Sequence, residues 1–473
     1  MTSVGIDIGT FHTLAVGLDG RVPLIPSATI PSIALLGGPT PIVGVDAVHH
    51  LDLGHELLQA PKLLLGGATP DSTLLREVMR KLAEQALTSV AGLPGARIVV
   101  TVPPKWSLAK CDLLGEALAS VGRERLFLHE PVALLVAAWH FASRHVDPSH
   151  RAKLNTFREI VVCDWGAGTV DLALVSRTGP AATPTFQCRS DATLMQWGGT
   201  SIARAAVDAL RAAGGALPVD RERAVFFLQQ HWASGTESPV ALDQLAPFVS
   251  RSRQEAAVAV RCEVERLLAG RSTKDILFVM HGGPLESLEL RADFAGALER
   301  MGIERDRQLH VGNAFCSEIE DGPANLRREA LVALGGALYS EHGRPLPEFQ
   351  YEVALRDAFG KTTSSVRLAV SEDLRGTQVV NPPYTDVDYS VAIRQMRDTE
   401  PTAIEKELAL HVRAEAVVRY RVEAAGVGYA TVSAQENMNI PVPRAFADAR
   451  LVSVVMPESS TRFTLDFAQA NKT

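Results

Sequence analysis

The feature that most limits the fold is a hairpin plan that occurs twice. Residues 4–8 form an apolar run that contains Asp7 near its end, followed by a glycine turn and a second apolar run at residues 13–18. The same plan recurs at Asp164, which ends an apolar run, precedes a glycine turn and leads into residues 170–175. The two hairpins are about one domain length apart. This duplication predicts two similar lobes, each presenting one carboxylate and one glycine turn to a shared cleft.

The two carboxylates carry a chemical requirement. A carboxylate at the end of a buried strand is costly to desolvate, so Asp7 and Asp164 need a cation or hydrogen-bond donors nearby. Glycine turns let backbone N–H groups approach an anion. Magnesium with a polyphosphate satisfies both requirements, because magnesium keeps several waters and is held by one or two carboxylates plus substrate phosphates. The alternative is that each aspartate only caps its own hairpin turn.

Composition excludes several classes of function. The chain has 473 residues and a formal charge of −7 without a basic block, so it offers no general electrostatic reason to bind nucleic acid or an anionic membrane. Its five cysteines are scattered and form no CxxC pair, which favours a reduced, cytoplasmic location. The first residues already form a strand pattern rather than a signal peptide. The apolar residues 24–36 are interrupted by prolines and are too short to cross a bilayer, so no membrane insertion is expected.

The hairpins resemble the two phosphate loops of the actin-like ATPase superfamily. Four further segments resemble, in the same order, motifs of the seventy-kilodalton heat-shock chaperone family: a strand before a lobe-spanning helix, a first connecting helix, an adenosine motif and a second connecting helix. They are residues 99–106, 129–133, 278–284 and 330–337. The resemblance covers residues 1 to about 340. It implies an α/β fold, a two-lobed actin-like (ribonuclease H-like) ATPase with duplicated lobes, and ATP or ADP with Mg²⁺ as cofactors.

The resemblance also implies roles for single residues. Asp7 and Asp164 would organise hydrated magnesium, Glu130 would position the attacking water, and Lys62 would stabilise charge on the transferring phosphoryl group. Glu130 is otherwise an ordinary charge at a helix N-terminus, and Lys62 is otherwise a solvated surface lysine. The nucleotide contacts implied are Gly9, Thr10, Phe11, His12, Gly166, Ala167, Gly168, Thr169, Gly198, Gly199, Gly282, Gly283 and Pro284.

Several departures from the family pattern bear on activity. Phe11 and His12 stand where the family keeps a small hydroxyl residue and an amide, which predicts slow hydrolysis. His12 is interpreted as a pH sensor, a phosphate contact or a solvated loop residue. Pro284 follows the glycines where the family has a serine, so the base stays open. The stretch between residues 200 and 281 is short and mostly helical in pattern, which predicts a reduced upper subdomain and an open pocket.

Three histidines, His140, His145 and His150, follow the first connecting helix at intervals of five. That interval fits neither one helix face nor a turn. We therefore expect a polar connector between the lobes rather than a metal site.

The chain changes character near residue 341. Residues 341–347 are rich in helix breakers, and alternating runs such as 365–370 and 417–422 follow. We predict a nucleotide-binding domain over residues 1–345 and a β-rich, sandwich-like domain over residues 346–473, without the family's helical lid. The β domain would bind an unknown protein or peptide partner.

Two functions stay open. The first is a slowly hydrolysing, chaperone-like switch in which nucleotide state is coupled to the β domain. The second is a non-catalytic or filament-forming actin-like scaffold that recruits a partner protein. A sugar kinase shares the fold but is disfavoured by the connecting motif at Glu130.

Overall fold

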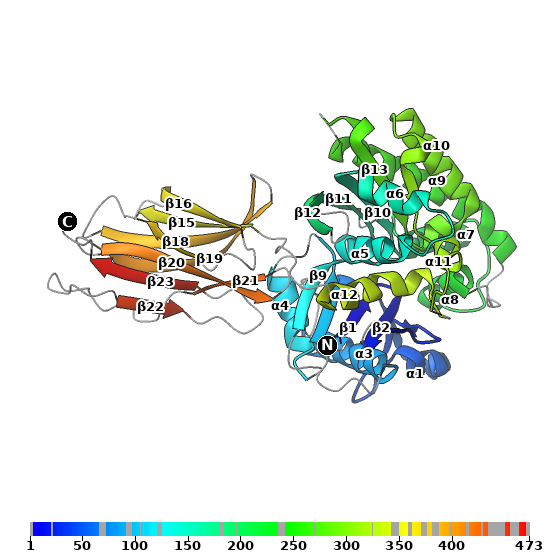
Figure 1. Ribbon diagram of the computed structural model, residues 1–473. Helices are drawn as coiled ribbons and strands as arrows, with labels where there is room; N and C mark the ends of the chain where they lie inside the picture. The colour runs from blue at the N-terminus through cyan, green and yellow to red at the C-terminus, as the bar shows by residue number, and fades with distance from the viewer. Residues whose placement is uncertain are drawn as a thin grey trace. The chain divides into compact units, whose positions relative to one another are not determined.

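The chain folds into an α/β structure, as predicted, with mixed sheets and helices that pack on them (Figure 1). The computed structural model describes residues 3–19, 22–65, 72–90, 97–104, 106, 108–120, 125–178, 184–194, 196–234, 242–268, 271–323, 325–341, 350–357, 362–369, 376–380, 387–397, 400–412, 416–426, 429–433, 450–454 and 463–469. The chain divides into two compact units. The first unit comprises Met1–Trp106 and Leu113–His342, and the second comprises Ser107–Asp112 and Gly343–Thr473.

The first sheet is built on the first predicted hairpin. Strands β1 and β2 pair antiparallel, and β8 and then β9 add in parallel on the other side of β1. The strand order is β3-β2-β1-β8-β9, with β4 paired to β2. The bounds are β1 Ser3–Ile8, β2 His12–Asp19, β3 Val22–Leu24, β4 Ile30–Pro31, β8 Arg97–Val102 and β9 Arg125–His129.

The second sheet has the same arrangement. Its order is β12-β11-β10-β13-β14, with antiparallel pairs on the β11 side of β10 and parallel pairs on the β13 side. The second predicted hairpin forms β10 and β11, so both hairpins occupy the same place in sheets of the same strand order. The bounds are β10 Glu159–Trp165, β11 Val170–Thr178, β12 Thr185–Leu194, β13 Ile276–His281 and β14 Gln308–His310.

Two apolar helices lie between the sheets (Figure 1). Helix α12 (Leu331–Glu341) packs on β1, β2 and β8, and helix α5 (Glu130–Ala142) contacts β10, β11 and β12. The helices cross so closely that a Cβ atom at Gly335 would overlap the carbonyl group of Ala133. Glycine is therefore required where the two backbones meet.

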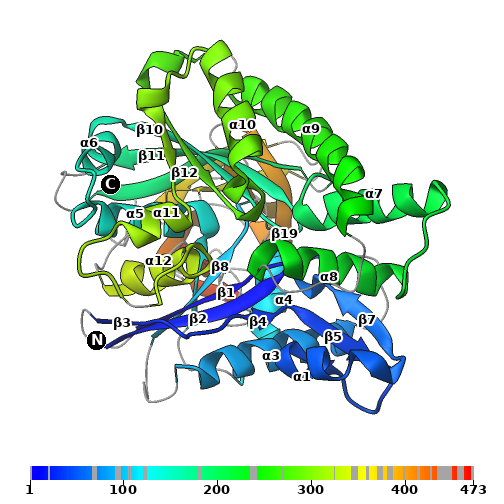
Figure 2. The ribbon, with the colours of Figure 1, turned by 90° about the vertical axis from the view of Figure 1, so that its right-hand side faces the viewer.

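Other helices cover the outer faces (Figure 2). Helix α3 packs on β1 and β2 and buries Val78, Met79 and Leu82. Helices α7, α8, α9 and α10 share the core of the second sheet. The described residues between 200 and 268 lie mainly in helices, as predicted. The bounds are α3 Ser72–Thr88, α4 Leu108–Ala117, α6 Ser149–Thr156, α7 Gly199–Ala212, α8 Arg221–Ser234, α9 Leu242–Leu267, α10 Leu288–Arg300 and α11 Asn313–Ser317.

A small three-stranded sheet completes the first unit. Strand β5 (Ile33–Leu36) lies between β6 (Ile42–Val43) and β7 (Glu56–Gln59). Its apolar residues form a cluster with Phe226 of α8, and Phe11 packs against that cluster. Helix α1 (Gly44–His49) lies between β6 and β7 in the chain, and helix α2 (Pro61–Leu64) follows β7.

The second unit contributes strands after residue 349. They form one sheet of order β16-β15-β18-β19 and another of order β17-β20-β23-β22, with β21 paired to β20. Residues 342–349 lie outside the described residues, so the predicted boundary at 345 stays a prediction. The bounds are β15 Gln350–Asp357, β16 Thr362–Ala369, β17 Gly376–Val380, β18 Val387–Arg397, β19 Glu400–Val412, β20 Ala416–Gly426, β21 Tyr429–Ser433, β22 Arg450–Val454 and β23 Phe463–Gln469.

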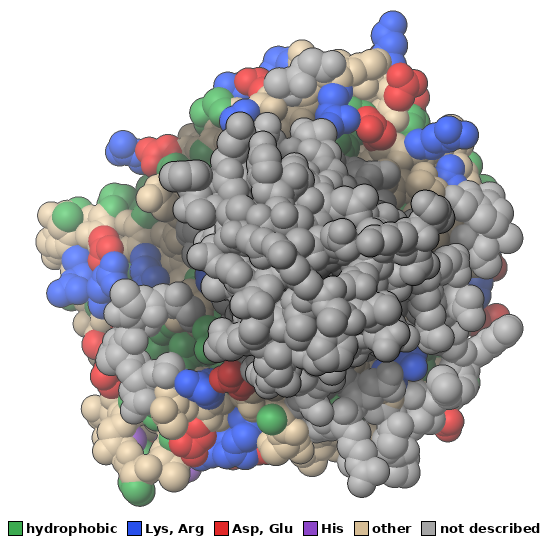
Figure 3. Space-filling view, turned by 90° about the vertical axis from the view of Figure 1, so that its left-hand side faces the viewer, with side chains coloured by type: hydrophobic (Ala, Val, Ile, Leu, Met, Phe, Trp, Pro, Cys, Tyr) green, Lys and Arg blue, Asp and Glu red, His purple; other side chains and the backbone are tan. Residues whose placement is uncertain are grey.

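The distribution of surface charge and the apolarity of the helices bear on binding to nucleic acid and to membranes. On the face shown in Figure 3, Lys and Arg side chains are interspersed with Asp and Glu over the described surface. No helix among the described residues combines the length and the apolarity needed to cross a lipid bilayer.

Candidate functional site

The two hairpin loops of the first unit meet. A Cβ atom at Gly168, in the β10–β11 loop, would overlap the side chain of Thr10 in the β1–β2 loop and lie 2.9 Å from Leu63 Cδ1. Gly9 is equally close to its surroundings, because a Cβ atom there would lie 2.6 Å from the carbonyl oxygen of His12. The glycines in these turns therefore let two loops from different sheets touch. The carboxylates that precede each turn are brought to the same region.

Lys62 lies at the centre of this region. It follows Ala60, which holds a left-handed backbone conformation (φ 56°), and Pro61, which begins the short helix α2. The Lys62 ammonium pairs with the Glu130 carboxylate and lies 3.9 Å from Asp7 Oδ1. The side chain is only 4% exposed, so the alternative of a solvated surface lysine is wrong. A non-glycine residue in the left-handed region costs about 1 kcal/mol or more, and such strain is commonly found at functional sites.

Glu130 is the first residue of α5, as expected from the proline at the next position, Pro131. Its carboxylate is buried and paired with Lys62 rather than lying in solvent as a simple helix charge. It raises the pKa of the aspartates around it. Glu130 and Lys62 thus tie the entrance of a connecting helix to the segment that carries Asp7.

Three aspartates of this cluster, Asp7, Asp164 and Asp171, have raised pKa values. Burial raises the pKa of Asp7 to about 7, while Lys62 opposes that rise and Glu130 adds to it. Burial also raises the pKa of Asp164 to about 7, again with Glu130. The ordinary pKa of an aspartate is near 4. Carboxylates that lie close together raise one another's pKa values. A bound cation would offset both the cost of burying their charges and the repulsion between them.

Asp171 is a further carboxylate that the sequence patterns did not identify. It lies directly opposite Asp164 in the β10–β11 hairpin, so both side chains project from the same face. Its oxygens accept hydrogen bonds of 2.6 Å from Thr169 and from Thr193. Burial raises its pKa to about 7, and Glu130 contributes. The available signal was a charged residue inside an otherwise apolar strand, where each buried charge requires a partner.

Two threonines hold the aspartates in place. Thr101 of β8 donates a hydrogen bond of 3.0 Å to Asp7 Oδ1. The Thr169 hydroxyl donates to Asp171. Both hydroxyls restrict the rotamers of the carboxylates that they contact.

The remaining predicted glycines pack around the second loop. The N–H groups at the start of α7 donate to this loop, from Gly199 to the Gly166 carbonyl (3.1 Å) and from Thr200 to the Ala167 carbonyl (2.6 Å). A Cβ atom at Gly198 would overlap Gly168. These predicted residues are therefore brought together, although two of their amides are already paired.

The predicted adenosine motif lies against the same loop. Gly282 has a φ of 115°, and a Cβ atom there would overlap the backbone of Trp165. Gly283 faces the Arg328 guanidinium, since a Cβ atom would lie 3.0 Å from Nη1. Pro284 lies 3.8 Å from the Cβ position of Gly199. The motif is thus adjacent to both the second loop and the start of α7.

Phe11 and His12 are not directed into the carboxylate cluster. The Phe11 ring lies 4.4 Å from the His12 ring and 6.2 Å from Phe226 of α8, between ring centroids. Burial lowers the pKa of His12 to about 4, although Glu329 opposes this shift. A pH-sensing role near neutrality is therefore wrong for His12, because it is already uncharged there.

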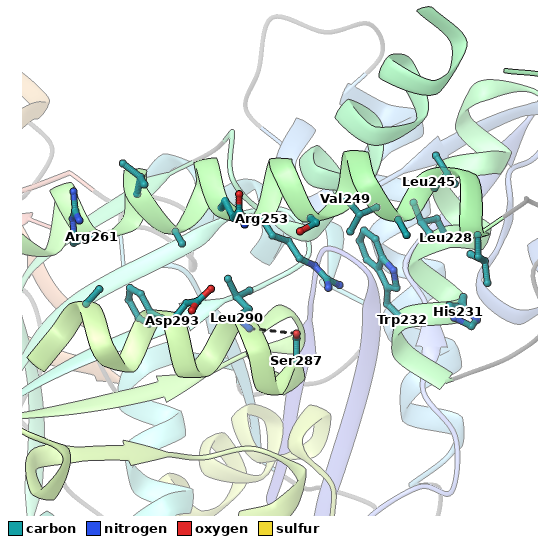
Figure 4. A pocket seen from close by; sticks show the side chains of 18 of the residues that line it. Leu228, His231, Trp232, Leu245, Val249, Arg253, Arg261, Ser287, Leu290 and Asp293 are labelled. Carbon is teal, nitrogen blue, oxygen red and sulfur yellow. Dashed lines mark hydrogen bonds between the residues drawn. The ribbon is translucent and has the colours of Figure 1, made fainter. Parts of the chain in front are cut away.

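A pocket of about 720 Å³ opens between α8, α9 and α10 (Figure 4). Trp232, Leu245, Val249 and Leu290 supply apolar lining, and the Arg253 guanidinium lies 5.0 Å from the centroid of the Trp232 ring. Ser287, four residues after Gly283, caps α10 at its edge. The pocket therefore begins where the predicted adenosine motif ends.

The histidine segment differs from the expected polar connector. His140 lies in the last turn of α5, and His145 is buried. The His145 ring lies 4.1 Å from the His150 ring and 4.8 Å from the Phe315 ring, between centroids. These aromatic contacts bury His145 within the predicted polar connector.

The described residues contain no group of three or more His, Cys, Asp or Glu side chains that could hold a metal ion directly. Carboxylates and hydroxyls nevertheless dominate around Lys62, and this donor chemistry suits a hydrated hard cation. No protein-family model matches the chain, and no curated protein matches its sequence.

Proposed function

We propose that the first unit is a magnesium-dependent nucleotide-binding module of the two-lobed, actin-like kind, and that it hydrolyses ATP slowly. One observation carries the proposal: Asp7, Glu130 and Asp171 interact with Lys62 where two equivalent hairpin loops meet. Two sheets of the same strand order, each placing an aspartate at the same end of its central strand, support a duplicated fold.

Magnesium would be held through its waters by Asp7 and Asp164, and it would neutralise charge on the phosphates. The chain's own groups would do the rest. Lys62 would face the transferring phosphoryl group, and Glu130 would orient water by accepting a hydrogen bond. Thr101 and Thr193 keep two carboxylates in fixed rotamers. Little covalent chemistry is required of the protein, so positioning and electrostatics account for the acceleration.

The pocket beside Ser287 is proposed to take the base. Its apolar lining and the Arg253–Trp232 pair suit a planar aromatic group, and it adjoins the Gly282–Gly283 turn. The base itself stays open, with ATP and ADP as the first candidates. The second unit would form the β-rich domain that binds a protein or peptide partner and responds to nucleotide state.

The test is magnesium-dependent phosphate release from ATP. We expect Asp164→Asn and Glu130→Gln to lower kcat by about 100-fold or more with a smaller change in ATP affinity, because their groups act mainly on the reacting phosphate. The matched control is Asp306→Asn, since this aspartate is 74% exposed and contacts none of the cluster residues.

Equal rates for all four proteins, at the level of buffer, would refute hydrolysis. If ATP still bound in that case and caused the protein to sediment, a non-catalytic or filament-forming actin-like scaffold would be the better description.

A further inference from the structure

A second buried cation lies near the carboxylate cluster. Arg328, in the turn that leads into α12, is 8% exposed, and its backbone N–H donates to Asn313 Oδ1 at 3.2 Å. Its guanidinium pairs with the neighbouring Glu329 carboxylate. Glu329 stays ionised: burial raises its pKa, but the Arg328 charge, hydrogen bonds from Arg328 and the backbone, and His12 together bring the pKa below its usual value.

The guanidinium lies against the glycine turn that precedes the proposed base pocket in the chain. Its Nη1 atom is 3.0 Å from the Cβ position of Gly283. The preceding residue, Gly282, packs on Trp165, which directly follows Asp164 in β10. Four residues after Gly283 in the chain, Ser287 lines the pocket. A nucleotide with its base in the pocket and its last phosphate near Asp164 would have to pass the Gly282–Gly283 turn, where Arg328 lies.

The charge balance around the carboxylate cluster indicates why a cation at position 328 would favour the binding of a phosphate group. Asp7, Glu130, Asp164 and Asp171 bring up to four negative charges, and Lys62 already pairs with two of them. A polyphosphate adds more negative charge, so binding requires further cations close to its path. After burial and Glu130, Arg328 is the next influence on the pKa of Asp164 and lowers it, which places its charge close to the cluster.

We propose that Arg328 is the specificity-determining residue that selects nucleotides carrying a diphosphate group, by donating its guanidinium N–H groups to the phosphates next to the sugar. This inference rests on the proposed function and deepens it. Glu329 holds the guanidinium in place by the same kind of charged hydrogen bond that a phosphate would accept. A planar guanidinium suits two oxygens at once, which an ammonium group does not.

The experiment measures the dissociation constants of ADP, adenosine and inorganic pyrophosphate by calorimetry, on the full chain with magnesium. We expect Arg328→Gln to weaken ADP and pyrophosphate by about 10- to 100-fold, the value of one charged hydrogen bond, and to change adenosine by less than about twofold. Arg328→Lys keeps the positive charge but lacks the paired N–H groups of a guanidinium, so its affinity for ADP and pyrophosphate should fall by about 3- to 10-fold. Melting curves establish that each variant is folded.

Two controls separate binding from packing. Arg327→Gln removes the same charge from the adjacent residue, whose guanidinium lies 4.0 Å from Glu329, and should leave all three constants within about twofold. Glu329→Gln removes the carboxylate that holds the Arg328 guanidinium, so it should weaken ADP and pyrophosphate by less than Arg328→Gln does and leave adenosine within about twofold. Equal losses for ADP and adenosine in Arg328→Gln, or no loss in either, would overturn the role of Arg328. If the wild-type protein bound neither ADP nor pyrophosphate, the proposed nucleotide site itself would be refuted.

Discussion

The aspartate at position 171 shows how a single residue links stability to function. Its carboxylate is buried, and its pKa of about 7 means that the folded protein binds a proton more tightly than the unfolded chain does. The contribution to stability is therefore full below the unfolded pKa near 4 and is lost as the pH rises through 7. A residue that is kept despite this cost is expected to have a role in binding or catalysis.

We predict that Asp171→Asn stabilises the protein at alkaline pH and abolishes turnover. Without magnesium, the gain in free energy of unfolding should grow by about 2 kcal/mol between pH 5 and pH 8, because the asparagine has no charge to desolvate. Urea unfolding at both pH values measures this gain. The exposed control Asp306→Asn should show no such growth, and a variant at position 171 that is less stable at pH 8 than at pH 5, relative to wild type, would contradict the argument.

Single residues also show which parts of the candidate site could be predicted from the sequence. Asp7, Lys62 and Glu130 lie in short motifs, and the structure brings all three together. Asp171 was missed although its charge inside an apolar run was a local signal, and Arg328 was missed because nothing in its local pattern marks it. Asp171 becomes significant only through its register opposite Asp164, and Arg328 only through its approach to Gly283. Both depend on contacts between distant segments.

At the scale of elements, the spacing of apolar residues predicted individual hairpins and a helix, but it did not predict how distant elements contact each other. The hairpins β1–β2 and β10–β11 follow from apolar runs with glycine turns, and α3 follows from its apolar face. The crossing of α5 and α12 could not be predicted in the same way. It depends on the separation of two backbones that are far apart in the sequence, and only the structure shows which glycine stands at the crossing.

Two adjacent glycines in α12 allow a matched test of that crossing. A Cβ atom at Gly335 would overlap the Ala133 carbonyl, whereas one at Gly336 would meet side-chain carbons of Val99 and Thr101 at 3.3 and 3.5 Å and the Cα atom of Gly5 at 3.6 Å. We expect Gly335→Ala to destabilise the first unit by about 2 kcal/mol or more, because two backbones must separate. Gly336→Ala should cost less than about 1 kcal/mol, since alanine favours helix. Thermal unfolding compares them, and equal losses would mean that the helices do not cross at Gly335.

At the scale of the whole molecule, the division into two compact units predicts how nucleotide affects unfolding. All residues of the proposed site belong to the first unit, Met1–Trp106 with Leu113–His342. A ligand that binds only a folded unit stabilises that unit by mass action, by about 2.7 kcal/mol at a hundred times its dissociation constant. The composition and periodicity of the chain predicted a change of character near residue 341, but they could not predict whether the two units unfold together.

We expect calorimetry of the full chain to show two transitions, of which ADP with magnesium raises only one. The shift should be about 2–4 °C at a hundredfold excess over the dissociation constant, because units of this size have large unfolding entropies. Asp164→Asn should remove most of the magnesium-dependent part of the shift, and the exposed Asp306→Asn should keep it. A rise of both transitions by the same amount would show that the stabilisation by nucleotide reaches the second unit as well, which contradicts the expectation of independent units. Such coupling is what a switch requires, so this outcome would also favour nucleotide control of the β-rich unit over a module that binds nucleotide independently.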